Sequence, residues 1–146
     1  MIEADKSCEL CATPGGEILW ESPICRVIRV DDLDYPGFCR VVLNAHVREM
    51  TDLAPTQQQY LMSVVFAAEA VVRQLFAPDK INLASFGNIV PHVHWHVIPR
   101  WQDDKKFPEP IWGSTQRHEI IHRRAVSNSE FAAALAQTLG IAEHRG

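Results

Sequence analysis

The stretch of sequence that decides the fold of this chain is Gly87-Asn88-Ile89-Val90-Pro91-His92-Val93-His94-Trp95-His96-Val97-Ile98-Pro99-Arg100. Its histidines alternate with apolar residues, and alternate residues of a β-strand point to opposite faces. A strand from residue 92 to about residue 100 therefore places three imidazoles on one face and apolar side chains on the core side. Buried ring nitrogens need hydrogen-bond partners, so a row of imidazoles is a poor filling for a core and indicates a functional face.

Three imidazoles on one face suit nucleophilic chemistry on phosphorus. The ordinary pKa of imidazole is about 6.5, so its neutral, nucleophilic form is abundant near pH 7. It can attack a phosphate and form a covalent intermediate while neighbouring imidazoles donate hydrogen bonds to phosphate oxygens. The Gly87-Asn88 turn offers backbone N–H groups to the same phosphate. The alternatives are a metal-chelating surface strand and a chance cluster; the glycine turn before the histidines and the Ile-Pro-Arg after them favour catalysis.

The rest of the chain predicts an antiparallel α+β domain with one long helix. Apolar residues recur at helical spacing from Pro55 to about Ala77, and Pro78 ends this helix. Ser127 with Glu130 resembles a capping box, which predicts a final helix near residues 128–139. Few crossover helices separate the strands, which favours antiparallel pairing. The expected strands are residues 17–22, 24–31, 38–44, 80–86 and 92–100, and 117–124 could form a last strand.

Composition limits the location and the partners of the chain. Its 146 residues carry a formal net charge of −4, which disfavours a dedicated DNA or RNA surface, since such a surface is normally basic. No run of 18 apolar residues is present, and residues 1–6 do not resemble the start of a signal peptide. We therefore expect one domain over residues 1–146, a cytoplasmic location, no membrane span and reduced cysteines. Cys25 and Cys39 lie in apolar strands and are expected to be buried.

Cys8 and Cys11 form a C-x-x-C pair, a spacing that indicates metal or redox chemistry in a reducing compartment. A redox role is disfavoured because no helix pattern begins at Cys8 to lower a thiol pKa. The remaining alternative is a reduced pair in a flexible N-terminal segment.

The stretch from His92 to Ile98 resembles the motif of the histidine triad family, in which three histidines alternate with hydrophobic residues. The resemblance covers most of the chain, because strands, long helix, glycine turn and triad strand follow one another in the family's order. It implies a HIT-like α+β fold: a central antiparallel sheet of about five strands, one long helix and a C-terminal helix. Within the family, the chain resembles the bacterial branch that includes diadenosine polyphosphate hydrolases.

The resemblance also implies an activity. Family members cleave or transfer at the α-phosphate of nucleotides, here of dinucleoside polyphosphates or nucleoside phosphoramidates, through a nucleotidyl-histidine intermediate and without a metal in the chemistry. His94 corresponds to the nucleophile, and His92 and His96 to the residues that orient it and contact the phosphate and leaving group. The transferase branch has glutamine at the position of His96, which favours hydrolysis in this chain. The alternatives are a nucleotidyltransferase and a non-catalytic nucleotide- or zinc-binding module.

Substrate contacts follow from the resemblance with one departure. Family members often have a longer glycine-rich loop and a Ser or Thr at the position of Ile89, which has no hydroxyl. The predicted phosphate contact is therefore Asn88, the nearest polar side chain, with Ser85 and Asn82 as weaker candidates. In the family, an acidic or amide residue shortly before the Pro-Gly-type turn contacts the ribose, and Asp31, with Asp32 as its neighbour, fits this position. The alternative for Asp31 is a loop carboxylate exposed to solvent.

Some histidine triad proteins bind structural zinc through a C-x-x-C pair, a histidine after the third strand and the first triad histidine. In this chain the corresponding set consists of Cys8, Cys11, His46 and His92. Two thiolates and two imidazoles suit tetrahedral zinc, which would connect the N-terminal segment to the catalytic strand.

The last expectation is a homodimer, which the family resemblance also implies. Met62, Phe66 and Val71 extend the apolar surface of the long helix beyond the stripe that one thin sheet can cover. A single sheet also leaves an edge strand with unpaired backbone groups, and a twofold partner would cover both surfaces.

Overall fold

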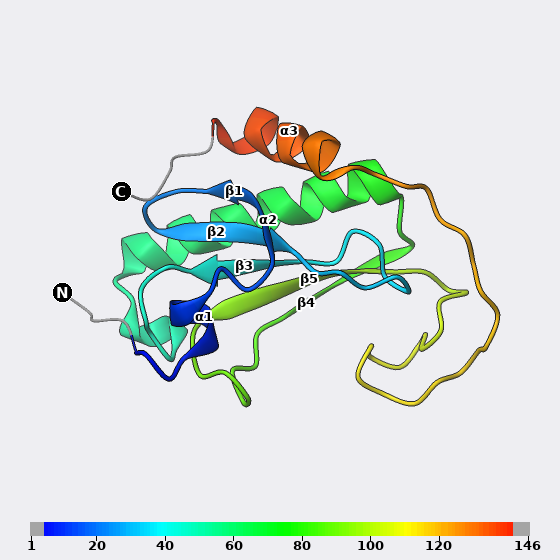
Figure 1. Cartoon of the computed structure of the whole chain (residues 1–146), viewed down its shortest axis with the longest axis horizontal. Coiled ribbons are helices and arrows are strands. Elements are labelled where there is room, and N and C mark those ends of the chain that lie inside the picture. The colour runs from blue at the N-terminus through cyan, green and yellow to red at the C-terminus, as the bar shows by residue number, and fades with distance from the viewer. Residues whose placement is uncertain (1–4, 142–146) are drawn as a thin grey trace.

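A computed structural model describes residues 5–141 of the chain. The described chain forms a five-stranded antiparallel sheet in the order β1-β2-β3-β5-β4, which confirms the predicted α+β class (Figure 1). The strands are β1 (Glu17–Glu21), β2 (Cys25–Arg29), β3 (Cys39–Leu43), β4 (Lys80–Ala84) and β5 (His94–Arg100). The helices are α1 (Glu9–Ala12), the 3-10 turn η1 (Met50–Asp52), α2 (Pro55–Phe76) and α3 (Asn128–Leu139). The expectations for residues 1–4 and 142–146, which belong to the predicted single domain, lie outside the described residues.

The long helix α2 matches its prediction at both ends. Pro55 occupies the first helical turn, and the backbone N–H of Ala54 donates to the side chain of Gln57. The helix ends at Phe76, because Ala77 adopts a left-handed conformation and Pro78 cannot continue a helix. One expectation is wrong: Val71 is buried in the core rather than exposed, whereas Phe66 remains 54% exposed.

The sheet has two differently covered faces, and this division positions the functional site. Helices α2 and α3 cover one face, where the main core contains the apolar side chains of the strands (Figure 1). The short helix α1 lies over the other face, where a second, smaller cluster joins Cys8 and Leu10 to Ile28 and Val42. The imidazoles of β5 face this less covered side.

The strand that carries the histidines is shorter than predicted. β5 begins at His94 rather than His92, because the segment Pro91–Val93 turns before it pairs. The backbone N–H of His92 donates to Val90, and Val93 exchanges hydrogen bonds with Val47 and Leu43. His92 therefore lies outside the regular alternation that places His94 and His96 on one face.

The predicted last strand over residues 117–124 is wrong. This segment pairs with no strand of the described chain and runs as an open arc from β5 towards α3 (Figure 1). Arginine side chains hold it instead: Arg123 pairs with Asp103, and Arg124 bonds to the carbonyl of Leu75 and to Glu130. One of the two hydrogen bonds of the predicted capping box of α3 is confirmed: the side chain of Ser127 accepts from the backbone N–H of Glu130.

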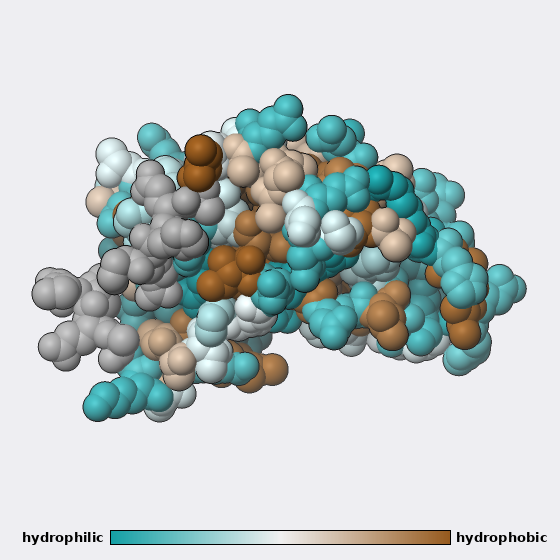
Figure 2. Space-filling model, turned by 45° about the horizontal axis from the view of Figure 1, so that its top comes forward, coloured by the Kyte–Doolittle hydropathy of each residue, from teal (hydrophilic) through white to brown (hydrophobic). Residues whose placement is uncertain are grey.

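Cys25 and Cys39 are completely buried, as predicted, and burial raises the pKa of each thiol to about 12. In the face shown by Figure 2, hydrophobic residues form small separate groups between hydrophilic ones. Over residues 5–141, no helix has both the length and the apolar character needed to cross a membrane.

Candidate active site and metal centre

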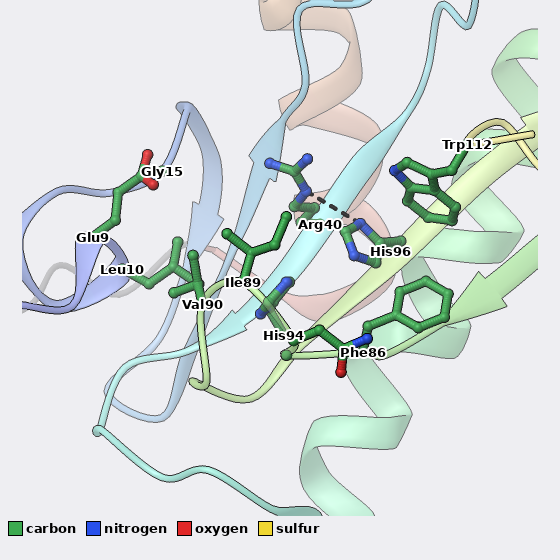
Figure 3. A pocket seen from close by; sticks show the side chains of 12 residues that line it. Glu9, Leu10, Gly15, Arg40, Phe86, Ile89, Val90, His94, His96 and Trp112 are labelled. Carbon is green, nitrogen blue, oxygen red and sulfur yellow. Dashed lines mark hydrogen bonds between the residues drawn. The ribbon is translucent and has the colours of Figure 1, made fainter.

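A cavity of about 470 Å³ lies on the face of the sheet that carries the histidines (Figure 3). Its walls come from several parts of the chain: α1 and Gly15 after it, β3, β5 and the two loops that flank β5. The lining residues used below are His94, His96, Arg40, Asn88, Phe86 and Trp112. The cavity is therefore assembled from segments far apart in sequence, around two of the three histidines.

His94 is held by the backbone of the histidine two residues before it. Its Nδ1 lies 2.6 Å from the carbonyl oxygen of His92, and since a carbonyl can only accept, Nδ1 carries the proton. In the neutral ring the lone pair is then on Nε2. The carbonyl of His94 in turn accepts from the hydroxyl of Ser85 at 2.8 Å, which fixes the backbone. The middle histidine is thus in the tautomer of a nucleophile.

His96 is buried and bonded to a cation. Arg40, directly opposite it in the β3–β5 pairing, donates from Nε to Nδ1 of His96 at 3.2 Å. Burial lowers the pKa of His96 to about 4, with further lowering by Arg40 and His94. His96 is therefore neutral at neutral pH, and its proton is on Nε2, where it can donate to a ligand.

Two aromatic side chains close the cavity beside His96. Trp112 packs edge-on against both His96 and Phe86, with ring centroids 5.2 Å and 5.1 Å apart. Trp112 is 54% exposed, so its indole covers the histidine while one side faces solvent. Trp101, by contrast, is buried in the core and packs under Arg123.

A buried carboxylate fixes the loop that carries Trp112. Asp104 accepts hydrogen bonds from Tyr35, from Arg100 and from the backbone N–H groups of residues 101, 106 and 107. Burial alone would raise the pKa of Asp104, but the bond from Arg100 and the backbone N–H donors outweigh burial and lower it to about 2. Arg100 also donates to the carbonyl of Glu109. This bond connects the hydrogen-bonded group around Asp104, called the Asp104 hub below, to the segment that carries Trp112.

The predicted substrate contacts are divided between two cavities. Asn88 lines the histidine cavity beside Gly87, whose φ of +72° favours glycine. Ser85 does not line this cavity; its hydroxyl supports the backbone of His94. Asp31 lines a second cavity of about 640 Å³, which shares Arg40 and Gly15 with the first.

The ring of His92 lies in a cluster with the other three predicted metal ligands. One ligand atom from each of Cys8, Cys11, His46 and His92 lies within 4.8 Å of the others. Nδ1 of His92 is 3.4 Å and 3.5 Å from the two sulfurs and 3.3 Å from Nδ1 of His46. Tetrahedral zinc with N and S ligands places neighbouring ligand atoms about 3.3–3.8 Å apart, so the donor set fits such an ion.

The tautomer of His92 also fits a metal. Its Nε2 lies 2.6 Å from the carbonyl oxygen of Leu43 and must donate, so the lone pair of the neutral ring is on Nδ1, inside the cluster. Burial lowers the pKa of His92, which favours this neutral form. Because His92 does not line the cavity, a metal in this cluster would act on the fold rather than on a ligand.

Helix α1 and its N-cap residue contribute both to the cluster of possible metal ligands and to the cavity. Cys8 and Cys11 enter the cluster, whereas Glu9 and Leu10 line the cavity (Figure 3). The buried Arg26 holds the same segment by donating to the carbonyls of residues 10, 13 and 14. A metal would therefore fix one wall of the cavity.

Sequence reasoning missed Arg40, Arg26 and the contribution of α1 to the cavity. Arg40 had a weak signal, since it is the charged residue inside an otherwise apolar strand (Cys39–Leu43). Only the register of β3 against β5 shows that it faces His96.

A comparison with family models matches residues 15–103 to the HIT domain. Among curated proteins, the chain is 32% identical over 85 residues to "AP-4-A phosphorylase" of Mycobacterium tuberculosis, covering 54% of this chain and 44% of the relative. It is 27% identical over 89 residues to "Bis(5'-nucleosyl)-tetraphosphatase [asymmetrical]" of Schizosaccharomyces pombe, covering 58% and 49%. The chain thus spans about half the length of the curated relatives it matches.

Solved structures agree over more of the chain. A histidine triad protein from Bradyrhizobium japonicum matches with a TM-score of 0.67 and 27% identity, covering 86% of this chain and 92% of that one. A histidine triad protein from Marinobacter aquaeolei VT8 matches with a TM-score of 0.66 and 29% identity, covering 95% and 94%. The sheet, the histidine row and these matches define an α+β protein with an imidazole-based site. The chain belongs to the histidine triad (HIT) family.

Proposed function

We propose that the protein is a nucleotide hydrolase that cleaves dinucleoside polyphosphates or nucleoside phosphoramidates at the α-phosphate. The observation that carries this proposal is the hydrogen bond from Nδ1 of His94 to the carbonyl of His92, which leaves Nε2 with the lone pair beside the cavity. Family membership and relatives named as a phosphorylase and a tetraphosphatase support the nucleotide class of substrate.

In the proposed first step, the lone pair of His94 Nε2 forms a bond to the α-phosphorus. The bond from phosphorus to the leaving oxygen or nitrogen breaks, and the leaving group keeps the electron pair. The neutral His96 stabilises it by donating a hydrogen bond from Nε2. In the second step, water adds to phosphorus, the P–Nε2 bond breaks, the water proton passes to solvent and His94 is restored.

The other predicted residues take supporting parts in this proposal. His92 positions His94 through its backbone carbonyl, and Ser85 does so through the carbonyl of His94 itself. Asn88 is proposed to contact the phosphate because it lines the same cavity. Asp31 is proposed to accept from ribose hydroxyls in the neighbouring cavity.

We further propose that the cluster of two cysteines and two histidines binds structural zinc. Bound zinc would supply a fixed cross-link between α1 and the segment before β5, and no Lewis-acid step. His46 and His92 would bind through Nδ1, and Cys8 and Cys11 as thiolates. Such a site needs reduced cysteines, in keeping with the proposed cytoplasmic location.

A phosphorylase is the second candidate, because one curated relative carries that name. In that reaction inorganic phosphate replaces water in the second step. A non-catalytic nucleotide- or zinc-binding module is the third candidate.

One experiment separates these three functions: a turnover screen with adenosine phosphoramidate, diadenosine polyphosphates and sugar nucleotides, with and without phosphate. Mononucleotide formed at the same rate with and without phosphate supports hydrolysis. Nucleoside diphosphate formed from diadenosine substrates only in the presence of phosphate indicates the phosphorylase. Bound but unprocessed nucleotide indicates the module.

The proposal includes a homodimer. Phe66 is 54% and Tyr60 37% exposed on α2, and β1 and β4 form the edges of the described sheet. A twofold partner that covers α2 and one edge strand would remove both surfaces from solvent.

A further inference from the structure

Arg40 has one hydrogen-bonding nitrogen engaged and two available. Its Nε donates to Nδ1 of His96 at 3.2 Å, and Nη1 and Nη2 have no hydrogen-bond or ion-pair partner within residues 5–141. Its side chain extends into the cavity that His94 and His96 line (Figure 3). A guanidinium presents its terminal N–H groups in a planar fork, which matches two oxygens of a phosphate.

The charge of Arg40 is costly where it lies. Burial lowers the pKa of its guanidinium, and the negative charge of Glu9 only partly offsets this effect. Among the residues that line the cavity, Arg40 carries the one permanent positive charge, and most of the others are apolar. A partly desolvated cation without a direct counter-ion attracts an anionic ligand strongly.

The position of Arg40 also distinguishes it from the other cation near the site. Arg40 lines both the histidine cavity and the neighbouring cavity that contains Asp31. Arg29 lines only the second of these, and its Nη1 already donates to the carbonyl of Val126 and to Asn128. A ligand that extends from Asp31 to His94 would pass Arg40.

We propose that Arg40 binds the phosphate group that His94 attacks, through Nη1 and Nη2, while its Nε holds His96 in the tautomer that donates from Nε2. This inference rests on the proposed nucleotide function. The fork would neutralise charge on the non-bridging oxygens as Nε2 of His94 approaches phosphorus, and the Nε bond would aim His96 at the leaving group. One side chain would thus serve both partners of the reaction.

The test uses the whole chain and compares two ligands, one that carries a phosphate and one that does not. Isothermal titration gives dissociation constants for AMP and adenosine with wild type, Arg40→Gln, Arg40→Lys and the control Arg48→Gln. Arg48 is exposed and lines neither cavity. Charge-assisted hydrogen bonds predict that Arg40→Gln weakens AMP binding by about 10- to 100-fold and leaves adenosine binding unchanged. Arg40→Lys should recover part of the AMP affinity, because it restores the charge but not the fork.

The outcomes separate this inference from the proposed function. Equal loss of AMP and adenosine binding in Arg40→Gln, or no loss of either, overturns the phosphate contact. Loss of turnover with unchanged AMP affinity also overturns it, and assigns Arg40 to the positioning of His96 alone. If wild type binds neither AMP nor adenosine and processes no nucleotide, the proposed function fails first. Melting curves of each variant confirm that the compared proteins are folded.

Discussion

Nδ1 of His94 and the carbonyl oxygen of His92 are 2.6 Å apart, so the middle histidine of the row is oriented by the backbone of the first. The imidazole of His92 points elsewhere, into the cluster with Cys8, Cys11 and His46. The rings of the two histidines therefore have separate surroundings: one faces the cavity and the other faces the cluster of possible metal ligands.

Replacing His94 with Asn should abolish turnover while nucleotide binding persists. The substitution removes the attacking Nε2, which acts on the chemical step, but leaves Arg40 and Asn88 in the cavity. We expect kcat to fall by at least about 1,000-fold and the AMP dissociation constant to change less than about threefold. Steady-state kinetics and titration check both values. Retention of more than a few per cent of wild-type activity would exclude His94 as the nucleophile.

Protein purified without chelator should contain one zinc ion per chain, and removal of the metal should weaken AMP binding. The second effect is expected because α1 and the residue just before it supply both Cys ligands and part of the cavity wall. Cys8→Ser and Cys11→Ser should lose the metal and melt at lower temperature, whereas Cys39→Ala, which removes a buried thiol outside the cluster, should keep it. Elemental analysis that finds no zinc would contradict the site and leave the His94 chemistry untouched.

The stability of the protein should decrease as the pH falls from about 6.5 to about 4 because of His96. Its pKa is about 4 in the folded chain, mainly through burial, and about 6.5 when unfolded. Between these pH values the unfolded chain binds more protons than the folded chain. The free energy of unfolding therefore decreases as the pH is lowered, by an amount on the order of 2 kcal/mol. Above about pH 6.5 this contribution is constant.

Urea unfolding of wild type and His96→Gln at several pH values checks this dependence. The variant should show a flatter profile, and the difference between the two proteins isolates His96 from the metal ligands, which also take up protons. The exposed His118→Gln serves as a control and should follow wild type. Parallel profiles for wild type and His96→Gln would show that His96 is not the group responsible.

Asp104→Asn should destabilise the protein by about 3–5 kcal/mol, because it removes the charge that satisfies the buried Arg100 and the turn after β5. Asp103→Asn, one residue earlier, removes a 56% exposed partner of Arg123 and should cost less than about 1 kcal/mol. Denaturant unfolding of the pair measures both effects. Similar losses for the two variants would mean that the Asp104 hub is not what holds this loop.

Sedimentation at micromolar concentration should give a mass near twice the 16.5 kDa of one chain. Placing a charge on the exposed part of α2 with Phe66→Asp should shift the equilibrium towards single chains, since an isologous interface receives the charge twice. A wild-type mass of one chain would show that the exposed face of α2 does not mediate self-association.

The fold was predictable where local patterns decide it. Helix α2 has proline at its first turn and proline just after its end, and the alternation from His94 to Val97 defines strand β5. Residues 117–124 contain the β-branched Ile120 and Ile121, but a strand needs a neighbour with free backbone groups, and the local sequence does not contain this information. Val71 was misplaced for a similar reason, because the core that covers it includes distant segments.

The sequence pointed to the histidines and to the possible metal ligands of the site, but not to its electrostatics. The role of His94 follows from the resemblance and stays a prediction; the resemblance also implied the set Cys8, Cys11, His46 and His92, whose ligand atoms lie within 4.8 Å of one another. Arg40 could not be assigned, since its role depends on which residue of β5 it opposes. The separation of Asp31 from the histidines into a neighbouring cavity likewise depends on tertiary structure.

The cross-strand pair of Arg40 and His96 also has a consequence for how the chain finds its pairing. Side chains alternate along β3, so a slip of one residue against β5 would turn Arg40 from the open face into the apolar layer under α2. It would also expose Val41 and Cys39, both fully buried in the native alignment. A guanidinium cannot enter that layer without losing its solvation, so misaligned sheets are disfavoured. A single charged residue thereby selects the register in which β3 pairs with β5.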